Sequence, residues 1–151
     1  MWDLEAAGGQ ARLSLDVCNL GDSGLTVYRS GKAVFSSTPT NADPSCPHQL
    51  AVVPERYKAQ GAVESDGFED SMVGTYSLQQ GDWVVIGSDG VLDNLNMQEL
   101  GPSFQAISDE DPTGPVAAEV VAAALRGRKV DDITAIAMFV ERCGQVLPSR
   151  L

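Results

Sequence analysis

Acidic residues next to three predicted strands could together hold a divalent cation. Asp22 follows the first predicted strand, Asp89 follows a later apolar strand, and Asp131 and Asp132 precede the last strand. If the last strand runs antiparallel to the other two, all three positions fall at the same edge of a sheet. Two unit negative charges about 4 Å apart repel by roughly 4 kcal/mol at an effective dielectric near 20, so gathered carboxylates need a cation to balance them.

The residue types at this edge favour a hard cation such as Mg²⁺ or Mn²⁺. Carboxylate oxygens without partnering His or Cys select these ions over zinc. Asp93 lies one helical turn after Asp89 and would face the same edge, where it orients a ligand or contacts the cation through a water. Each acid next to a glycine is by itself a common turn former. The metal site is therefore predicted from the combination of three acids beside three strands. Glycines that permit tight turns flank the acids, at Gly21, Gly24, Gly87 and Gly90.

The hydrophobic pattern predicts strands and helices in alternation along the chain. Alternating apolar and polar residues predict a strand over 11–20, and apolar runs around Ser30-Gly31-Lys32 predict a hairpin. Residues 36–71 contain several prolines among polar residues and are expected to form a long surface loop. Further elements are predicted as strands over 73–78, 83–88 and 133–140, a short helix over 91–100 and a helix over 115–126. The strands over 83–88 and 133–140 are apolar on both faces, so both should be buried between two layers.

Size and charge exclude several classes of function. A chain of 151 residues suits one domain or part of one. The net charge of −11 disfavours nucleic acid as a partner, because binding to phosphates requires clustered Lys and Arg. No apolar stretch approaches the roughly 18 residues that span a bilayer, so membrane insertion is not expected. The segment Met1–Glu5 lacks the basic start of a targeting peptide, so the chain is expected to be soluble.

The cysteines do not support a thiol-based activity or a zinc site. Cys18, Cys46 and Cys143 are odd in number and have no CxxC spacing. A cysteine phosphatase needs an Arg six residues after its nucleophile to bind phosphate, and none of the three has one. Cys46 and His48 lack a second pair of ligands, so His48 is expected to be an ordinary loop residue.

Three segments together resemble the last signature motifs of the PPM-type metal-dependent protein serine/threonine phosphatases. They are Asn19-Leu20-Gly21-Asp22-Ser23-Gly24, then Gly81-Asp82 with Gly87-Ser88-Asp89-Gly90-Val91-Leu92-Asp93-Asn94, and finally Asp131-Asp132-Ile133-Thr134. The segments 45–50 and 66–71 further resemble the branch of this family known from mitochondria and chloroplasts. The resemblance covers about residues 13–140 and implies one of these two compartments.

The resemblance implies an α+β fold: a partial α-β-β-α sandwich of antiparallel sheets with flanking helices. It also implies Mg²⁺ or Mn²⁺ ions, which activate a water for attack on phosphoserine or phosphothreonine in a protein substrate. Asp89 and Asp131 resemble the direct, catalytic metal ligands, and Asp22 with Asp89 and Asp93 resembles the acids around a third ion. Gly90 and Asp132 resemble positions beside the ligands, and Asp132 stands where many relatives have Asn.

Residues 1–10 do not resemble the segments that precede these motifs in the family. Relatives carry a Glu-Asp pair near a phosphate-binding Arg, and an Asp-Gly whose carboxylate bridges two ions. Asp3 and Glu5 lack that context. We therefore expect an N-terminal remnant over 1–10, a partial phosphatase domain over 11–140 and a loose C-terminal tail over 141–151. Such a truncated phosphatase would be weakly active or inactive alone. The alternative is a non-catalytic fragment that acts as a binding or regulatory module.

Overall fold

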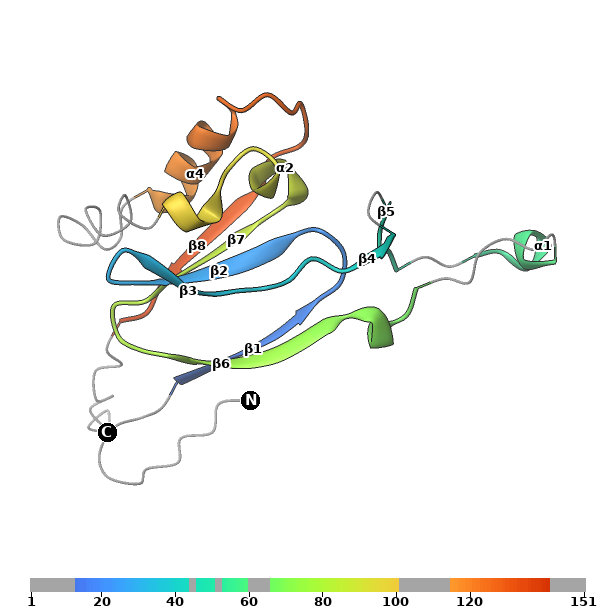
Figure 1. The fold of residues 1–151 in the computed structure, drawn as a ribbon, viewed down its shortest axis with the longest axis horizontal. Helices are drawn as coiled ribbons and strands as arrows, with labels where there is room; N and C mark the ends of the chain where they lie inside the picture. Colours follow the sequence, from blue (N-terminus) through green and yellow to red (C-terminus); the bar gives the residue numbers. More distant parts are fainter. Residues whose placement is uncertain (1–12, 44–45, 51–52, 60–65, 101–114, 142–151) are drawn as a thin grey trace, which may run out of the picture.

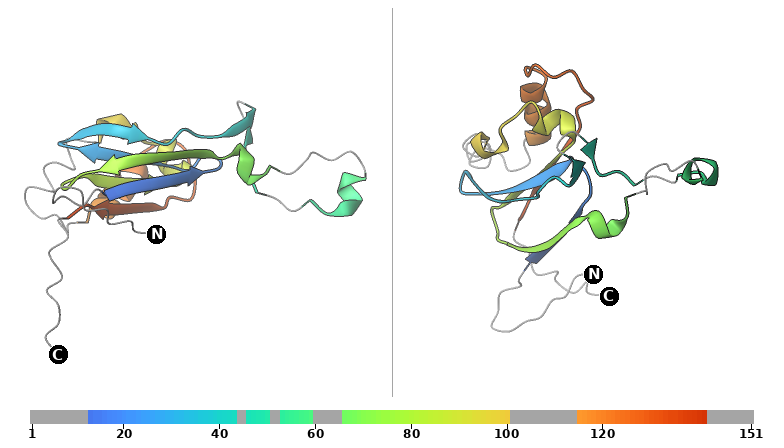
Figure 2. Two further views of the ribbon diagram at one scale, coloured as in Figure 1. Left: turned by 90° about the horizontal axis from the view of Figure 1, so that it is seen from below. Right: turned by 45° about the vertical axis from the view of Figure 1, so that its right-hand side comes forward.

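Two main antiparallel sheets, a short β4–β5 pair and a layer of helices make up the described part of the chain. The computed structural model describes residues 13–43, 46–50, 53–59, 66–100 and 115–141. The larger sheet has the strand order β3-β2-β7-β8, and the smaller sheet pairs β1 with β6. Helices α2 and α4 lie over one face of the larger sheet, and the β1–β6 pair lies toward its other face (Figures 1 and 2). This arrangement confirms the predicted α+β fold with antiparallel sheets.

The elements have the following bounds. The strands are β1 Leu13–Asn19, β2 Gly24–Arg29, β3 Lys32–Ser36, β4 Asn41–Asp43, β5 Cys46–Pro47, β6 Met72–Leu78, β7 Trp83–Gly87 and β8 Ala135–Phe139. The α-helices are α1 Glu55–Lys58, α2 Asp89–Leu92 and α4 Val116–Ala124. The 3-10 helices are η1 Phe68–Asp70 and η2 Met97–Glu99. The predicted N-terminal segment 1–10 and the predicted tail after Glu141 lie outside the described residues.

The core lies between the helices and the larger sheet. Helix α4 buries Val116, Val120 and Ala124, whose spacing of four places them on one face of the helix. Tyr28 and Val85 face this helix from the sheet and are almost fully buried. Alternation along a strand turns their neighbours Val27 and Val84 to the opposite face, and both of these are also buried.

The two sheets are joined by side chains that reach from one to the other. Phe35 on β3 stacks on Tyr76 on β6 with ring centroids 5.0 Å apart. Arg29 at the end of β2 donates a hydrogen bond to the Ser77 carbonyl oxygen over 3.2 Å. Its guanidinium also makes a two-pronged ion pair with Asp82, with both N···O distances at 2.8 Å, and the Asp82 side chain is fully buried. The turn before β7 is thereby attached to both sheets.

Three predicted elements differ from the structure. The predicted strand over 133–140 was expected to be buried on both faces, but β8 is an edge strand, and Ile136 and Met138 on it are 52% and 42% exposed. The expected loop over 36–71 contains the short elements β4, β5, α1 and η1 among its described residues. The predicted helix over 91–100 is two short pieces, α2 and η2, since Asn94 donates back to Gly90 O and Asn96 caps η2 by accepting from Gln98 N.

Candidate metal centre

The predicted acids lie at one end of the larger sheet. In the strand register Gly24 of β2 faces Gly87 of β7, and Gly87 faces Ala135 of β8. Asp22 comes two residues before this row, Asp89 comes two residues after it, and Asp131 lies on the segment that leads into β8. The expectation that all three strands share a sheet was wrong in one respect. The strand before Asp22, β1, pairs with β6, so Asp22 reaches this end through the strand that follows it, β2.

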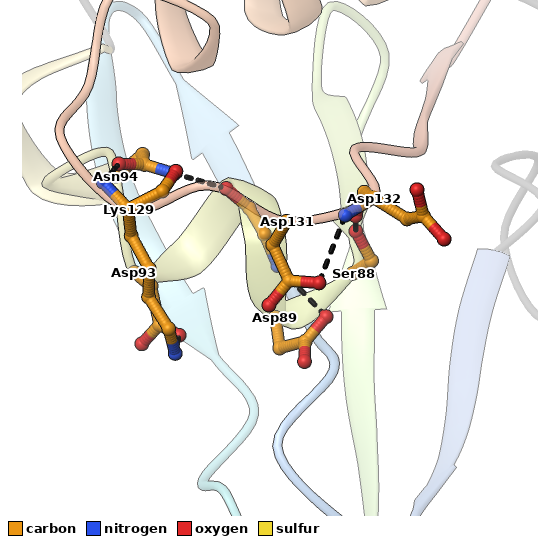
Figure 3. A network of polar contacts seen from close by, with 8 residues as sticks. Ser88, Asp89, Asp93, Asn94, Lys129, Asp131 and Asp132 are labelled. Carbon is orange, nitrogen blue, oxygen red and sulfur yellow. Dashed lines mark hydrogen bonds and ion pairs between the residues drawn. The ribbon is translucent and has the colours of Figure 1, made fainter.

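Asp89 and Asp131 are brought together by direct contact between their backbones. A Cβ placed on Gly90 would lie 2.5 Å from the Asp132 carbonyl oxygen and 3.3 Å from the Asp131 Cβ, so only glycine permits this approach. Ser88 fastens the two segments further, because its hydroxyl donates to Asp132 O and accepts from Thr134 N, both over 3.1 Å. The carboxylates of Asp89 and Asp131 lie beside each other in Figure 3.

Each of these two carboxylates keeps one oxygen available for a cation. Asp89 Oδ1 accepts a hydrogen bond from Gly90 N, and Asp131 Oδ1 accepts one from Asp132 N, each over 2.8 Å. These contacts fix the orientation of the carboxylates. Within the described ranges, no hydrogen bond or ion pair engages Oδ2 of either residue. Two anionic oxygens from separate loops therefore converge without a bound partner.

The ammonium group of Lys129 lies next to the predicted acids. Lys129 forms an ion pair with Asp93 Oδ2. The pKa of Lys129 is raised, first by this hydrogen bond and also by the charges of Asp93, Asp131 and Asp89. Figure 3 shows Lys129 and Asp93 extending side by side on the flank of the Asp89–Asp131 pair. Sequence reasoning had not singled out Lys129, although it lies only two residues before Asp131.

The other predicted site residues occupy supporting positions. The Asp132 side chain points away from Asp89 and Asp131 in Figure 3, and its backbone makes the contacts described above. Asp22 is half-buried and follows Gly21, whose positive φ of 90° requires glycine in practice. Gly21 N donates to the Thr40 hydroxyl over 2.7 Å, and Thr40 N donates to Gly21 O over 2.9 Å. This loop is thereby fixed against the segment before β4.

A second group of possible ligands lies outside the predicted set. Among the described residues, the group of three or more whose ligand atoms all lie within 4.8 Å is His48, Asp66 and Asp70. The four predicted acids do not gather so closely. His48 Nδ1 lies 2.9 Å from Asp66 Oδ1, and Gln49 N donates to Asp66 Oδ2 over 2.7 Å. The pKa of Asp66 is lowered, mainly by the Gln49 hydrogen bond and then by His48.

This second group joins the two segments that resemble the mitochondrial and chloroplast branch, 45–50 and 66–71. Leu50 and Asp66 also form an isolated parallel β-bridge. Asp70 Oδ2 accepts from Gly67 N over 2.9 Å, so a backbone N–H engages one oxygen of each of the two carboxylates. Sequence reasoning compared His48 only with Cys46 and therefore missed its contact with Asp66, which joins two distant segments of the chain.

The donor set at the end of the larger sheet fits a hard divalent cation. Its ligand atoms are carboxylate oxygens, and within the described residues it contains no thiolate or imidazole. A side-chain ammonium is already drawn to the same acids. Asp89 and Asp131 would therefore offer suitable ligands to Mg²⁺ or Mn²⁺.

Within the described part of the chain, no helix has the length and apolar character needed to cross a bilayer.

Comparison with known proteins identifies the family. No family model matches the chain. It is 35% identical to the protein phosphatase PTC7 homolog fig of Drosophila ananassae over 72% of its own length and 33% of the relative. It is 34% identical to the probable protein phosphatase 2C 1 of Oryza sativa subsp. japonica, over 78% of its own length and 31% of the relative. The chain thus spans about a third of the length of these curated relatives.

A solved structure agrees with the sequence relatives on the fold. The photosystem II phosphatase PBCP superposes with a TM-score of 0.66 and 24% identity, over 85% of this chain and 59% of that one. The acids at the end of the larger sheet lie on the segments that resemble the family motifs. The chain therefore belongs to the PPM-type, or protein phosphatase 2C, family of metal-dependent protein serine/threonine phosphatases.

Proposed function

We propose that the chain contributes part of the catalytic centre of a protein phosphatase that hydrolyses phosphoserine and phosphothreonine. The observation that carries this proposal is the contact of Asp89–Gly90 with Asp131–Asp132, which sets two free carboxylate oxygens side by side. The acidic pair comes from segments about forty residues apart, on the loops of two adjacent strands. Turn formation alone does not require such convergence of like charges.

The roles of the residues follow from their positions. A divalent ion, when bound, lowers the pKa of a water molecule and neutralises charge on the phosphoryl oxygens. Asp89 and Asp131 would hold that ion, and their Oδ1 contacts keep the free oxygens in place. Asp22 and Asp93 would serve a further ion at the same end of the sheet. Gly90 and the Asp132 backbone position the ligands through close packing.

The substrate and compartment are part of this proposal. The relatives are named as protein phosphatases, and we propose that this protein likewise acts on a phosphoprotein. Segments 45–50 and 66–71 resemble the branch of the family known from mitochondria and chloroplasts, so we propose one of these organelles as the location of this protein. The chain spans about a third of the length of the curated relatives, so we expect slow turnover from the 151 residues by themselves.

Hydrolysis of a chromogenic phosphate ester by the 151-residue chain tests the proposal. We expect slow turnover that requires Mn²⁺, is abolished by EDTA and falls at least about 100-fold in Asp89→Asn, because a metal ligand is lost. Glu119→Gln is the matched control. It removes the same charge from an exposed position on α4 and should leave the rate unchanged.

The outcomes separate the two functions under consideration. Turnover that persists in EDTA or in Asp89→Asn would contradict the proposed mechanism. If Mn²⁺ binds in an Asp89-dependent way but no ester or phosphopeptide is hydrolysed, the chain acts as a non-catalytic binding module. A phosphothreonine peptide should be a substrate under the same conditions if the proposal is correct.

A further inference from the structure

We infer that Lys129 is a tethered cation that neutralises Asp93 and must leave it before a divalent ion can bind there. The inference rests on the proposed metal site at the end of the larger sheet. It assigns to Lys129 a role in setting metal affinity, distinct from that of a ligand. Three features of the structure carry it: the charge environment of the ammonium group, the anchoring of the Lys129 backbone and the exposure of the side chain.

The Lys129 ammonium group lies within the field of three of the predicted ligands. Its ion pair with Asp93 is direct, and the carboxylates of Asp131 and Asp89 act on it from nearby. A divalent ion bound among these acids would be repelled by an ammonium group at that position. Lysine is a compact, strongly hydrated charge on a flexible stem, so it can be exchanged for another cation more readily than a rigid guanidinium can.

The backbone of Lys129 is held in place independently of its side chain. Lys129 N donates to Asn94 Oδ1, and Asn94 Nδ2 donates to Lys129 O, each over 2.9 Å. Asn94 also donates to Gly90 O over 3.0 Å, so the same residue joins this loop to the start of α2. A Cβ on Gly127 would lie 2.1 Å from Asn94 Oδ1, which shows how closely the loop packs on Asn94.

The side chain, in contrast, lies largely in solvent. It is 55% exposed, and Asp93 is 40% exposed. A fixed backbone with an exposed, flexible side chain lets the ammonium group swing into water while the loop that carries Asp131 keeps its place. Exposed ion pairs contribute at most about 1 kcal/mol, so a divalent ion can displace this one. The cost of displacement would lower the affinity of the Asp93 position for metal.

Mn²⁺ binding to Lys129→Met, measured by isothermal titration calorimetry, tests the inference. Methionine keeps much of the length of the side chain and removes the charge. We expect binding about fivefold tighter than in the unaltered chain, because the ion pair that competes with the metal for Asp93 is gone. Lys58→Met is the matched control. Lys58 is 51% exposed and pairs with Glu55 over 3.0 Å, away from the candidate site, so its removal should change the affinity less than twofold.

Asp93→Asn shows whether Lys129 acts through Asp93. In that background, Lys129→Met should change Mn²⁺ affinity less than twofold. A second readout is the melting temperature in EDTA, which Lys129→Met should lower because the acids then lose their counter-charge.

The possible results separate this inference from the proposed function. Equal Mn²⁺ affinity of the unaltered chain and Lys129→Met would overturn the inference and leave the metal site standing. A gain that persists in Asp93→Asn would also overturn it, because Lys129 would then act only by its general charge. Absence of Mn²⁺ binding in every variant would refute the metal site itself, and the inference with it.

Discussion

Asp131→Asn should weaken Mn²⁺ binding to the chain by at least about 100-fold, the largest effect that we expect from one substitution at the site. The amide keeps an oxygen that can accept the hydrogen bond from Asp132 N, so the loop should hold its conformation. What is lost is the negative charge and the free anionic oxygen beside Asp89. Isothermal titration calorimetry measures the affinity, and the melting temperature in EDTA shows whether the fold is retained.

The neighbouring acid provides the comparison for this prediction. Asp132→Asn removes the same charge one residue later, but the Asp132 side chain points away from Asp89 and Asp131 (Figure 3). Mn²⁺ affinity should change less than about threefold. Equal losses in the two variants would mean that binding depends on the overall charge of the segment, and the assignment of Asp131 as a ligand would then be wrong.

Arg29→Met should destabilise the fold by about 3 kcal/mol, the largest expected loss of stability. Among the described residues, the substitution leaves the fully buried carboxylate of Asp82 with one hydrogen-bond donor, Gln79 N, at 2.8 Å. It also removes the link from β2 to the Ser77 carbonyl oxygen on β6. Both consequences weaken the junction of the two sheets, far from the candidate metal centre.

Urea unfolding measures this loss. Arg56→Met is the control. Arg56 lies on the short helix α1, which buries none of its residues. Its guanidinium lies over the ring of the neighbouring Tyr57. It should change stability by less than about 0.5 kcal/mol. Arg29→Lys should recover only part of the loss, because an ammonium group cannot reproduce the two-pronged pair with Asp82. A loss below about 1 kcal/mol in Arg29→Met would contradict this account of the junction.

The sequence predicted the longer strands and the β2–β3 hairpin, but it missed β4 and β5 and did not specify which of the other strands pair. The alternation of apolar and polar residues predicted β1 and its approximate bounds. Nothing in that alternation says whether β1 pairs with β6 or β7, because pairing depends on contacts between distant segments. Similarly, apolar residues on both faces correctly predicted the burial of β7. In β8 the same pattern was misleading, because its position at the edge of the sheet leaves Ile136 and Met138 exposed.

The sequence singled out the acids of the candidate site but not the residues that surround them. Asp22, Asp89 and Asp131 were found because acids beside glycines at strand ends have a recognisable pattern, and their roles as ligands stay predictions. Lys129 was missed because its ion pair with Asp93 spans 36 positions of the sequence. The contact of His48 with Asp66 was missed for the same reason. Short-range patterns do not encode such pairs, which appear only once the loops are placed in space.

Anomalous diffraction from a crystal of the chain soaked in Mn²⁺ tests the metal centre most directly. We predict a strong manganese peak in contact with the carboxylates of Asp89 and Asp131, with Lys129 turned away from Asp93 if a further ion binds there. A peak only at His48, Asp66 and Asp70, or none near Asp89 and Asp131, would contradict the proposal that these acids form the metal centre.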